Sequence, residues 1–251
     1  MSSYLLDIAL DTGSPGLFVV DRIARKRGFE PLATKKSYGG GGDGRHDTTR
    51  GVFPSFRLGQ LEFADALATT SKGEAEPTGR YHGYLGVGAF GGYRVVLDLA
   101  NDRLILGPSA ETGGAPYWDI DGQLLVTAGE TSGGRTGLFL LDTGATGTIV
   151  AESFAARHPE ARMGAGVDIF GFGGRLAGAR TLQGLEIAFD GTSAGGELRV
   201  GDFSLRSRLA GVEVAGYLGL VMLDGSRIVL DTVARSVSVV KPAGPPSKTD
   251  R

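Results

Sequence analysis

The sequence contains no cysteine, one tryptophan and three histidines in 251 residues. Without cysteine there is no disulfide framework, no thiol nucleophile and no cysteine metal site. No apolar run has the length of a transmembrane span. Basic residues number 26 and acidic residues 28, and no basic block is present that could release the counterions of nucleic-acid phosphates. The sequence therefore excludes thiol chemistry and disfavours both a membrane span and a nucleic-acid partner.

The two ends of the chain carry little information about location. Residues 1–6 have neither the charged region nor the apolar length of a signal peptide. The sequence as it stands encodes no export signal, so the compartment stays open; export to a periplasm or out of the cell is favoured if the N-terminus is truncated. Residues 243–251 offer no large apolar side chain to bury, and we expect a disordered tail there.

Glycine is the most over-represented residue, with 43 of 251 positions against a usual share of about 7%. The glycines interleave with strand-like runs such as residues 94–99, which favours a folded β protein over a low-complexity chain. Residues 95–106 predict a hairpin, and residues 122–128 and 138–141 predict strands. Only short helices are expected, at residues 20–27 and 151–157.

An internal repeat organises the chain. Residues 10–14, which read Leu-Asp-Thr-Gly-Ser, return 131 residues later as Leu-Asp-Thr-Gly-Ala at residues 141–145. Two further segments return 133 residues later, and a weaker glycine-rich match has a similar offset: 83–86 with 216–219, 96–98 with 229–231, and 38–42 with 170–174. Agreement in collinear segments at nearly one spacing predicts a duplication, and residues 107–116 have the composition of a linker.

The paired Asp-Thr-Gly turns, each after an apolar strand and each followed about 75 residues later by Leu-Gly, resemble the aspartic proteases. Both the two-domain pepsin-like enzymes and the dimeric retroviral (retropepsin-like) type share this pattern, and the resemblance spans about residues 5–241. It implies an all-β, bilobal, pepsin-like fold with two β-barrel-like lobes related by a pseudo-two-fold axis. The expected lobes are residues 1–110 and 111–242.

The resemblance also implies a site and an activity. Asp11 and Asp142 would share one proton and activate the water that cleaves a peptide bond, as in an aspartic endopeptidase. No metal and no cofactor are required. The partner would be a peptide or protein substrate, and a monomer is expected because one chain supplies both aspartates. The supporting turns would be Thr12, Gly13, Ser14, Thr143, Gly144 and Ala145, with the threonines bonding across the axis and the glycines admitting the carboxylates closely.

The two turns differ at one position. Ser14 can donate a hydrogen bond to the Asp11 carboxylate, whereas Ala145 offers Asp142 no such donor. We therefore expect Asp11 to be the ionised member and Asp142 the protonated one. A bell-shaped rate profile with an acidic to weakly acidic optimum follows from this assignment.

The glycine-rich stretch at residues 38–44 resembles the flap of these enzymes, a hairpin that closes over substrate. Tyr38, Gly40 and Gly41 are the expected flap or substrate residues. An ordinary mobile loop explains the same composition equally well. Residues 170–174 are the corresponding stretch of the second half.

Several alternatives remain open. Both aspartates could be plain turn residues, or the chain could be a non-catalytic binding protein that keeps the cleft, or a purely structural β protein. Residues 86–91 fit Gly-x-Gly-x-x-Gly, but a strand follows where a dinucleotide site needs a helix. His46, His82 and His158 lack metal-ligand spacing, and a solvated surface position is expected for each.

Overall fold

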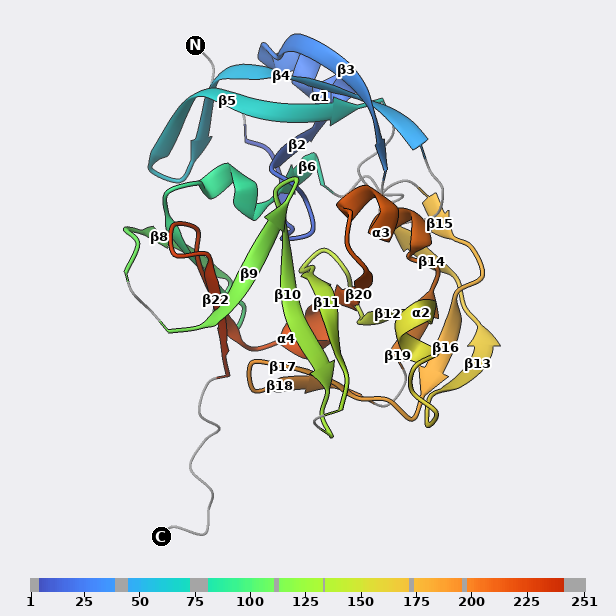
Figure 1. Cartoon of the computed structure of the whole chain (residues 1–251). Helices are drawn as coiled ribbons and strands as arrows, with labels where there is room; N and C mark the ends of the chain where they lie inside the picture. Colours follow the sequence, from blue (N-terminus) through green and yellow to red (C-terminus); the bar gives the residue numbers. More distant parts are fainter. Residues whose placement is uncertain are drawn as a thin grey trace, which may run out of the picture.

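Strands dominate the architecture of the chain, as the sequence predicts (Figure 1). The structure is a computed structural model and describes residues 5–38, 45–72, 81–110, 113–132, 134–171, 174–195 and 198–241. No helix in these ranges is long and apolar enough to cross a membrane. The described helices are short: α1 (Asp21–Ala24), η1 (Arg25–Arg27), η2 (Val87–Phe90), α2 (Glu152–Ala155), α3 (Ser204–Ala210) and α4 (Leu220–Leu223).

The strands before and after the predicted linker form two successive series. The first series is β1 (Ile8–Leu10), β2 (Leu17–Val20), β3 (Glu30–Tyr38), β4 (Arg45–Leu58), β5 (Leu61–Ser71), β6 (Gly83–Leu85), β7 (Arg94–Asp98) and β8 (Arg103–Gly107). The second series is β9 (Ala115–Ile120), β10 (Gln123–Glu130), β11 (Thr136–Leu141), β12 (Ile149–Ala151), β13 (Arg162–Gly166), β14 (Ile169–Gly171), β15 (Gly174–Leu176), β16 (Arg180–Gln183), β17 (Ile187–Phe189), β18 (Thr192–Ala194), β19 (Leu198–Gly201), β20 (Val214–Leu218), β21 (Arg227–Asp231) and β22 (Ser236–Val240).

The two halves pair their strands in the same order. The first sheet runs β1-β6-β2-β5-β4-β3, and the second half repeats this order as β11-β20-β12-β19-β16-β13. In each half the strand before the Asp-Thr-Gly turn is parallel to the strand before Leu-Gly, with Leu10 opposite Leu85 and Leu141 opposite Leu218. The sequence repeat therefore corresponds to a repeat of local topology.

A continuous sheet joins the halves. Strand β7 of the first half lies antiparallel to β21 of the second, with Val96 opposite Val229. These two strands are themselves one of the repeated sequence segments, so the junction is symmetric about that residue pair. The sheet extends through β22, β9 and β10 to β11 (Figure 1). One large cluster of buried apolar side chains contains residues from strands of both halves.

Most local expectations agree with the structure. The hairpin β7–β8, the strands β10 and β11, and the short helices α1 and α2 lie where the sequence predicts them, with ends shifted by one to three residues. The division into lobes at residues 110 and 111 stays a prediction. The expectation of a solvated His158 is wrong, because its side chain is only 1% exposed and its ring packs on Phe154, four residues earlier in the chain.

Asp98 is a buried charge at the end of the junction strand β7. Its carboxylate accepts hydrogen bonds from Asn101 at 2.8 Å, Arg227 at 2.9 Å and Arg103 at 3.1 Å. The Asn101 amide and the two guanidinium groups hold the pKa of Asp98 down, at about 2. Because Arg227 belongs to β21, this carboxylate helps to fasten the two halves to each other.

We expect Asp98→Ala to lower the midpoint of thermal unfolding by several degrees, because it leaves two guanidinium groups without their shared anion. The folded-state pKa of Asp98 is below the ordinary aspartate value of about 4, so Asp98 stabilises the fold fully above that pH. This stabilisation is lost as the pH falls towards 2, and the difference between wild type and variant should shrink over that interval.

Asp47→Ala is the matched control, since Asp47 pairs with Lys36 on the surface and such pairs contribute about 0–1 kcal/mol. Thermal unfolding followed by circular dichroism at several pH values measures both variants. Equal losses in the two variants would contradict the role assigned to Asp98.

Candidate active site at the meeting of two turns

The Asp11 and Asp142 turns meet at the interface between the two halves of the chain. Strand β1 ends at Leu10 and β11 ends at Leu141, so each aspartate follows a paired strand. The Asp11 N–H donates to Leu85 O, and the Asp142 N–H donates to Leu218 O, both at 3.0 Å. Each turn is therefore braced by the apolar-Gly segment of its own half, as the resemblance implies.

Thr12 and Thr143 exchange hydrogen bonds across this interface. The Thr12 N–H donates to Thr143 Oγ1 at 3.1 Å, and the Thr143 N–H donates to Thr12 Oγ1 at 3.0 Å. Each hydroxyl then donates to a carbonyl of the opposite half, Leu141 O at 2.6 Å and Leu10 O at 3.2 Å. Both threonines are buried, so these four bonds fix the two turns relative to each other.

The absence of a side chain at Gly13 and Gly144 leaves space for the two carboxyl groups. A Cβ built on Gly13 would lie 2.5 Å from Asp142 Oδ1, and one on Gly144 would lie 2.6 Å from Asp11 Cγ. No real Cβ tolerates such separations. Each glycine therefore faces the aspartate of the other half, and a side chain at either position would displace a carboxyl group.

The two carboxyl groups lie within hydrogen-bond reach of each other. The Gly13 N–H donates to Asp11 Oδ1 at 2.8 Å, while the Gly144 and Ala145 N–H groups donate to Asp142 Oδ1 at 2.9 and 3.1 Å. Both residues keep partial solvent exposure, so a small molecule such as water can reach them from the open side.

Burial raises the pKa of both aspartates. For Asp142, desolvation comes first and the neighbouring Asp11 charge second, and together they raise the pKa to about 8. Desolvation also raises the pKa of Asp11, although backbone N–H groups and the contact with Asp142 oppose the rise. Because the two groups are coupled, their protonation is a property of the pair rather than of either residue alone.

Ser14 does not make the expected hydrogen bond from its hydroxyl to the Asp11 carboxylate. Its hydroxyl donates to Gly16 O at 3.3 Å rather than to the Asp11 carboxylate. The turn directs the backbone N–H of Ser14, not the side chain, towards Asp11. The serine at position 14 and the alanine at position 145 therefore do not explain which carboxyl group is protonated.

The sequence did not single out the residue that contacts the Asp11 turn from the second half, or the residue that supports it. Gln123, at the start of β10, donates its side-chain N–H to Gly13 O, and Arg206 of α3 donates to Gln123 Oε1. A contact between positions 110 residues apart leaves no local sequence pattern. Tyr217 is buried next to the pair, and desolvation raises the pKa of its phenol.

The flap region is only partly described. Strands β3 and β4 pair antiparallel, with Tyr38 opposite Arg45, and the assignment of a flap stays a prediction. Gly40 and Gly41 lie outside the described residues. In the second half, β13 and β16 correspond to β3 and β4 in strand order, and β14 and β15 form a separate second hairpin between them in the sequence, with Ile169 opposite Leu176.

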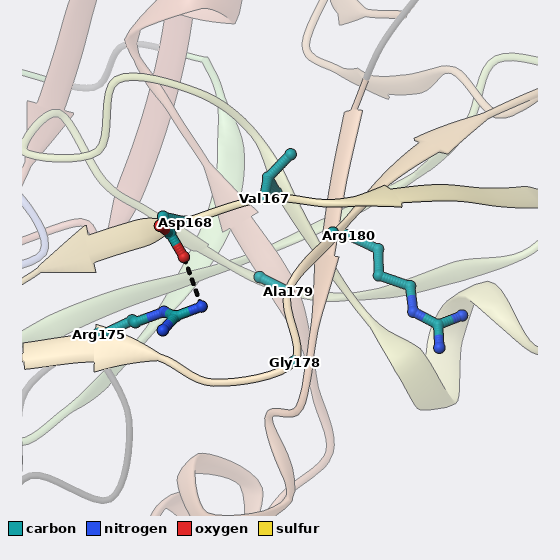
Figure 2. A pocket seen from close by; sticks show the side chains of 7 residues that line it. Val167, Asp168, Arg175, Gly178, Ala179 and Arg180 are labelled. Atoms are coloured by element: carbon teal, nitrogen blue, oxygen red, sulfur yellow. Dashed lines mark ion pairs between the residues drawn. The ribbon is translucent and has the colours of Figure 1, made fainter.

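A pocket of about 380 Å³ lies beside this second hairpin (Figure 2). Residues 166–168 form one wall, and Arg175 and residues 178–180 form the other. The Asp168 carboxylate and the Arg175 guanidinium form an ion pair at 2.6 Å within it. Neither aspartate of the pair lines the pocket, so it is separate from the candidate active site.

The fold of the chain is similar to that of a solved aspartic proteinase. A solved structure with this fold is the crystal structure of an aspartic proteinase from Irpex lacteus, which superposes with a TM-score of 0.57 at 15% sequence identity. The match covers 97% of this chain and 92% of that protein. It establishes the all-β, pepsin-like fold at the level of architecture. No protein-family model and no curated protein matches the sequence.

We expect Gly144→Ala to destabilise the fold by about 1–3 kcal/mol, since the new methyl group must push the Asp11 carboxyl group aside. Gly91→Ala is the control, because a Cβ on Gly91 meets nothing within 4 Å. Urea unfolding of both variants measures the effect. A Gly144→Ala protein as stable as Gly91→Ala would show that the carboxyl groups are not packed as described.

Proposed function

We propose that the protein is an aspartic endopeptidase that hydrolyses peptide bonds with water activated between Asp11 and Asp142. One observation carries the proposal: two carboxyl groups from separate turns lie within hydrogen-bond reach, held there by the threonine exchange and by facing glycines. A fold needs no such pair for stability, because two adjacent buried carboxyl groups repel each other when ionised.

The pair has the chemistry that the reaction requires. The ionised carboxylate accepts a proton from the attacking water, and the protonated carboxyl group donates a hydrogen bond to the scissile carbonyl oxygen. A tetrahedral diol results without a covalent intermediate. The elevated pKa of Asp142 suits it to the second role, and the backbone N–H groups that favour the charged form of Asp11 suit that residue to the first.

The substrate in this proposal is a peptide or protein segment in extended conformation. Tyr38 and the adjoining Gly40 and Gly41 would cover it as a flap. A single chain holds both aspartates, so a monomer suffices for activity. The substrate sequence depends on the loops around the pair.

Digestion of a peptide library across pH, with and without a statine-type transition-state mimic, tests the proposal. Cleavage that the mimic blocks would support it. If the mimic binds but no peptide is cleaved at any pH, the protein is a non-catalytic binder that keeps the cleft. If neither occurs, the proposal fails.

We expect Asp11→Asn and Asp142→Asn each to reduce kcat by about 100- to 10,000-fold, because each variant removes one partner of the proton transfer while conserving side-chain volume. Steady-state kinetics on the best library peptide measure the loss, and circular dichroism checks the fold. Ser14→Ala is the control, since the Ser14 hydroxyl does not contact the carboxylate. Wild-type turnover in either asparagine variant would refute the mechanism.

The elevated pKa of Asp142 has a consequence for stability. A carboxyl group whose folded-state pKa is raised stabilises the fold fully below the ordinary value of about 4 and loses that contribution as the pH rises through the folded value, here about 8. We expect the free energy of unfolding to decline over this range in the wild type and to decline less in Asp142→Asn. The alkaline limb of the rate profile should lie near the same upper value, above the weakly acidic range expected from sequence.

Urea unfolding of both proteins at intervals between pH 4 and about 9 measures this difference. Parallel curves for the wild type and Asp142→Asn would show that the carboxyl group is not buried against Asp11 as described.

A further inference from the structure

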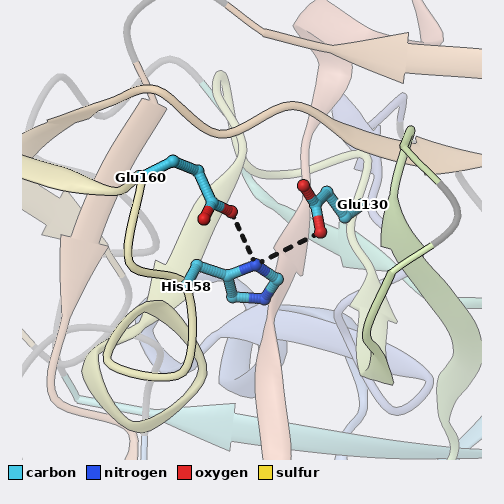
Figure 3. A group of neighbouring side chains, drawn as sticks. All are labelled: Glu130, His158 and Glu160. Atoms are coloured by element: carbon cyan, nitrogen blue, oxygen red, sulfur yellow. Dashed lines mark hydrogen bonds and ion pairs between the residues drawn. The ribbon is translucent and has the colours of Figure 1, made fainter.

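A cluster of three ionisable side chains lies at the far end of β10 from the aspartate pair. It comprises Glu130, His158 and Glu160, and their ligand atoms all lie within 4.8 Å of one another (Figure 3). Gln123 at the other end of β10 contacts the Asp11 turn. Seven residues of extended strand separate Gln123 from Glu130, a distance of roughly 23 Å. The cluster is therefore independent of the candidate active site.

His158 is held in one orientation. Its ring packs on Phe154 with 4.8 Å between centroids. The backbone around it is fixed, because its N–H donates to Ala155 O at 3.0 Å and its carbonyl accepts from Ala161 at 3.1 Å. The orientation places Nδ1 towards the two glutamates, whereas Nε2 is buried without a hydrogen-bond partner among the described residues. Nδ1 is thus the nitrogen that is available for a ligand.

Both carboxylates approach this one nitrogen. Nδ1 lies 3.0 Å from Glu160 Oε1 and 3.4 Å from Glu130 Oε2, and Figure 3 shows both contacts ending on the same atom. A single N–H cannot donate a linear hydrogen bond to two carboxylates. Even a protonated imidazole brings one positive charge to two negative ones, so the cluster keeps a net charge of −1. A divalent cation with neutral imidazole would balance it.

The donors match a zinc ion in type and spacing. Zinc binds imidazole nitrogen and carboxylate oxygen at about 2.0–2.2 Å in tetrahedral geometry, which puts neighbouring ligand atoms about 3.3 Å apart. The observed separations of 3.0 and 3.4 Å are close to this value. Glu160 is 41% exposed, so an ion can enter from solvent, and water can complete the coordination.

We propose that Glu130, His158 and Glu160 form a binding site for one divalent transition-metal ion, with Zn²⁺ the preferred occupant. The ion bonds to Nδ1 of the neutral imidazole, whose one proton then lies on Nε2, and to one oxygen of each carboxylate. It ties the end of β10 to the segment between α2 and β13. By binding both segments, the ion stabilises the second half of the chain.

Isothermal titration calorimetry of the chelator-treated full chain with ZnCl₂ tests the site. We expect one saturable site per chain and a thermal midpoint that rises with the zinc concentration. Glu160→Gln and Glu130→Gln should each weaken binding about tenfold or more. MgCl₂ and CaCl₂ should bind much more weakly, because both ions prefer oxygen ligands alone.

Glu62→Gln is the matched control. Glu62 pairs with Arg57 in the first half of the chain, so its loss should leave the zinc isotherm unchanged. Glu160→Gln changes a partly exposed side chain, so the test does not need a substitution of buried His158 that could prevent folding. The proposal is overturned if the wild type shows no saturable zinc binding, or if both cluster variants bind zinc as the wild type does; the cluster is then an ion pair alone. Neither result bears on peptide hydrolysis.

Discussion

Two carboxyl groups that would repel each other if both were ionised lie close together where the halves of the chain meet, and the surrounding structure holds them there. The threonine exchange fixes the two turns, and each glycine leaves space for the aspartate of the opposite half. Four hydrogen bonds of a buried network are strong together because all of their groups are satisfied. If one turn moved, its hydrogen bonds to the other turn would break. The geometry of the pair is therefore a property of the interface and not of either half.

The junction sheet makes that interface possible. Strands β7 and β21 pair symmetrically about Val96 and Val229, and the buried Asp98 carboxylate accepts hydrogen bonds from a guanidinium group on each side of the junction. The strands that carry the aspartates are braced by β6 and β20, within the topology that both halves repeat. The approximate position of the pair therefore depends on ordinary strand pairing. The turns themselves set the final placement of the two carboxyl groups.

The sequence predicts the parts of this arrangement that have a local or repeated pattern. The Asp-Thr-Gly turns, the Leu-Gly segments and the hairpin β7–β8 each occupy a short run of residues, and repetition at one offset makes them visible. The sequence does not predict contacts that depend on tertiary packing, whether their members lie far apart or close together in the chain. The Ser14 hydroxyl turns to Gly16, Gln123 contacts Gly13, and His158 is buried against Phe154. Each outcome depends on tertiary packing that residue types do not encode individually.

The halves are not equivalent in how they support the site. Strand β10 pairs with β11 and continues to β17, and its first residue also reaches across to Gly13 of the first half. The first half has no described strand in the corresponding position beside β1, which pairs with β6. The second half therefore supports both turns. Strand β10 is paired with β9 at Gln123 and with β17 at Glu130, so the sheet of the second half sets the position of Gln123 beside the Asp11 turn.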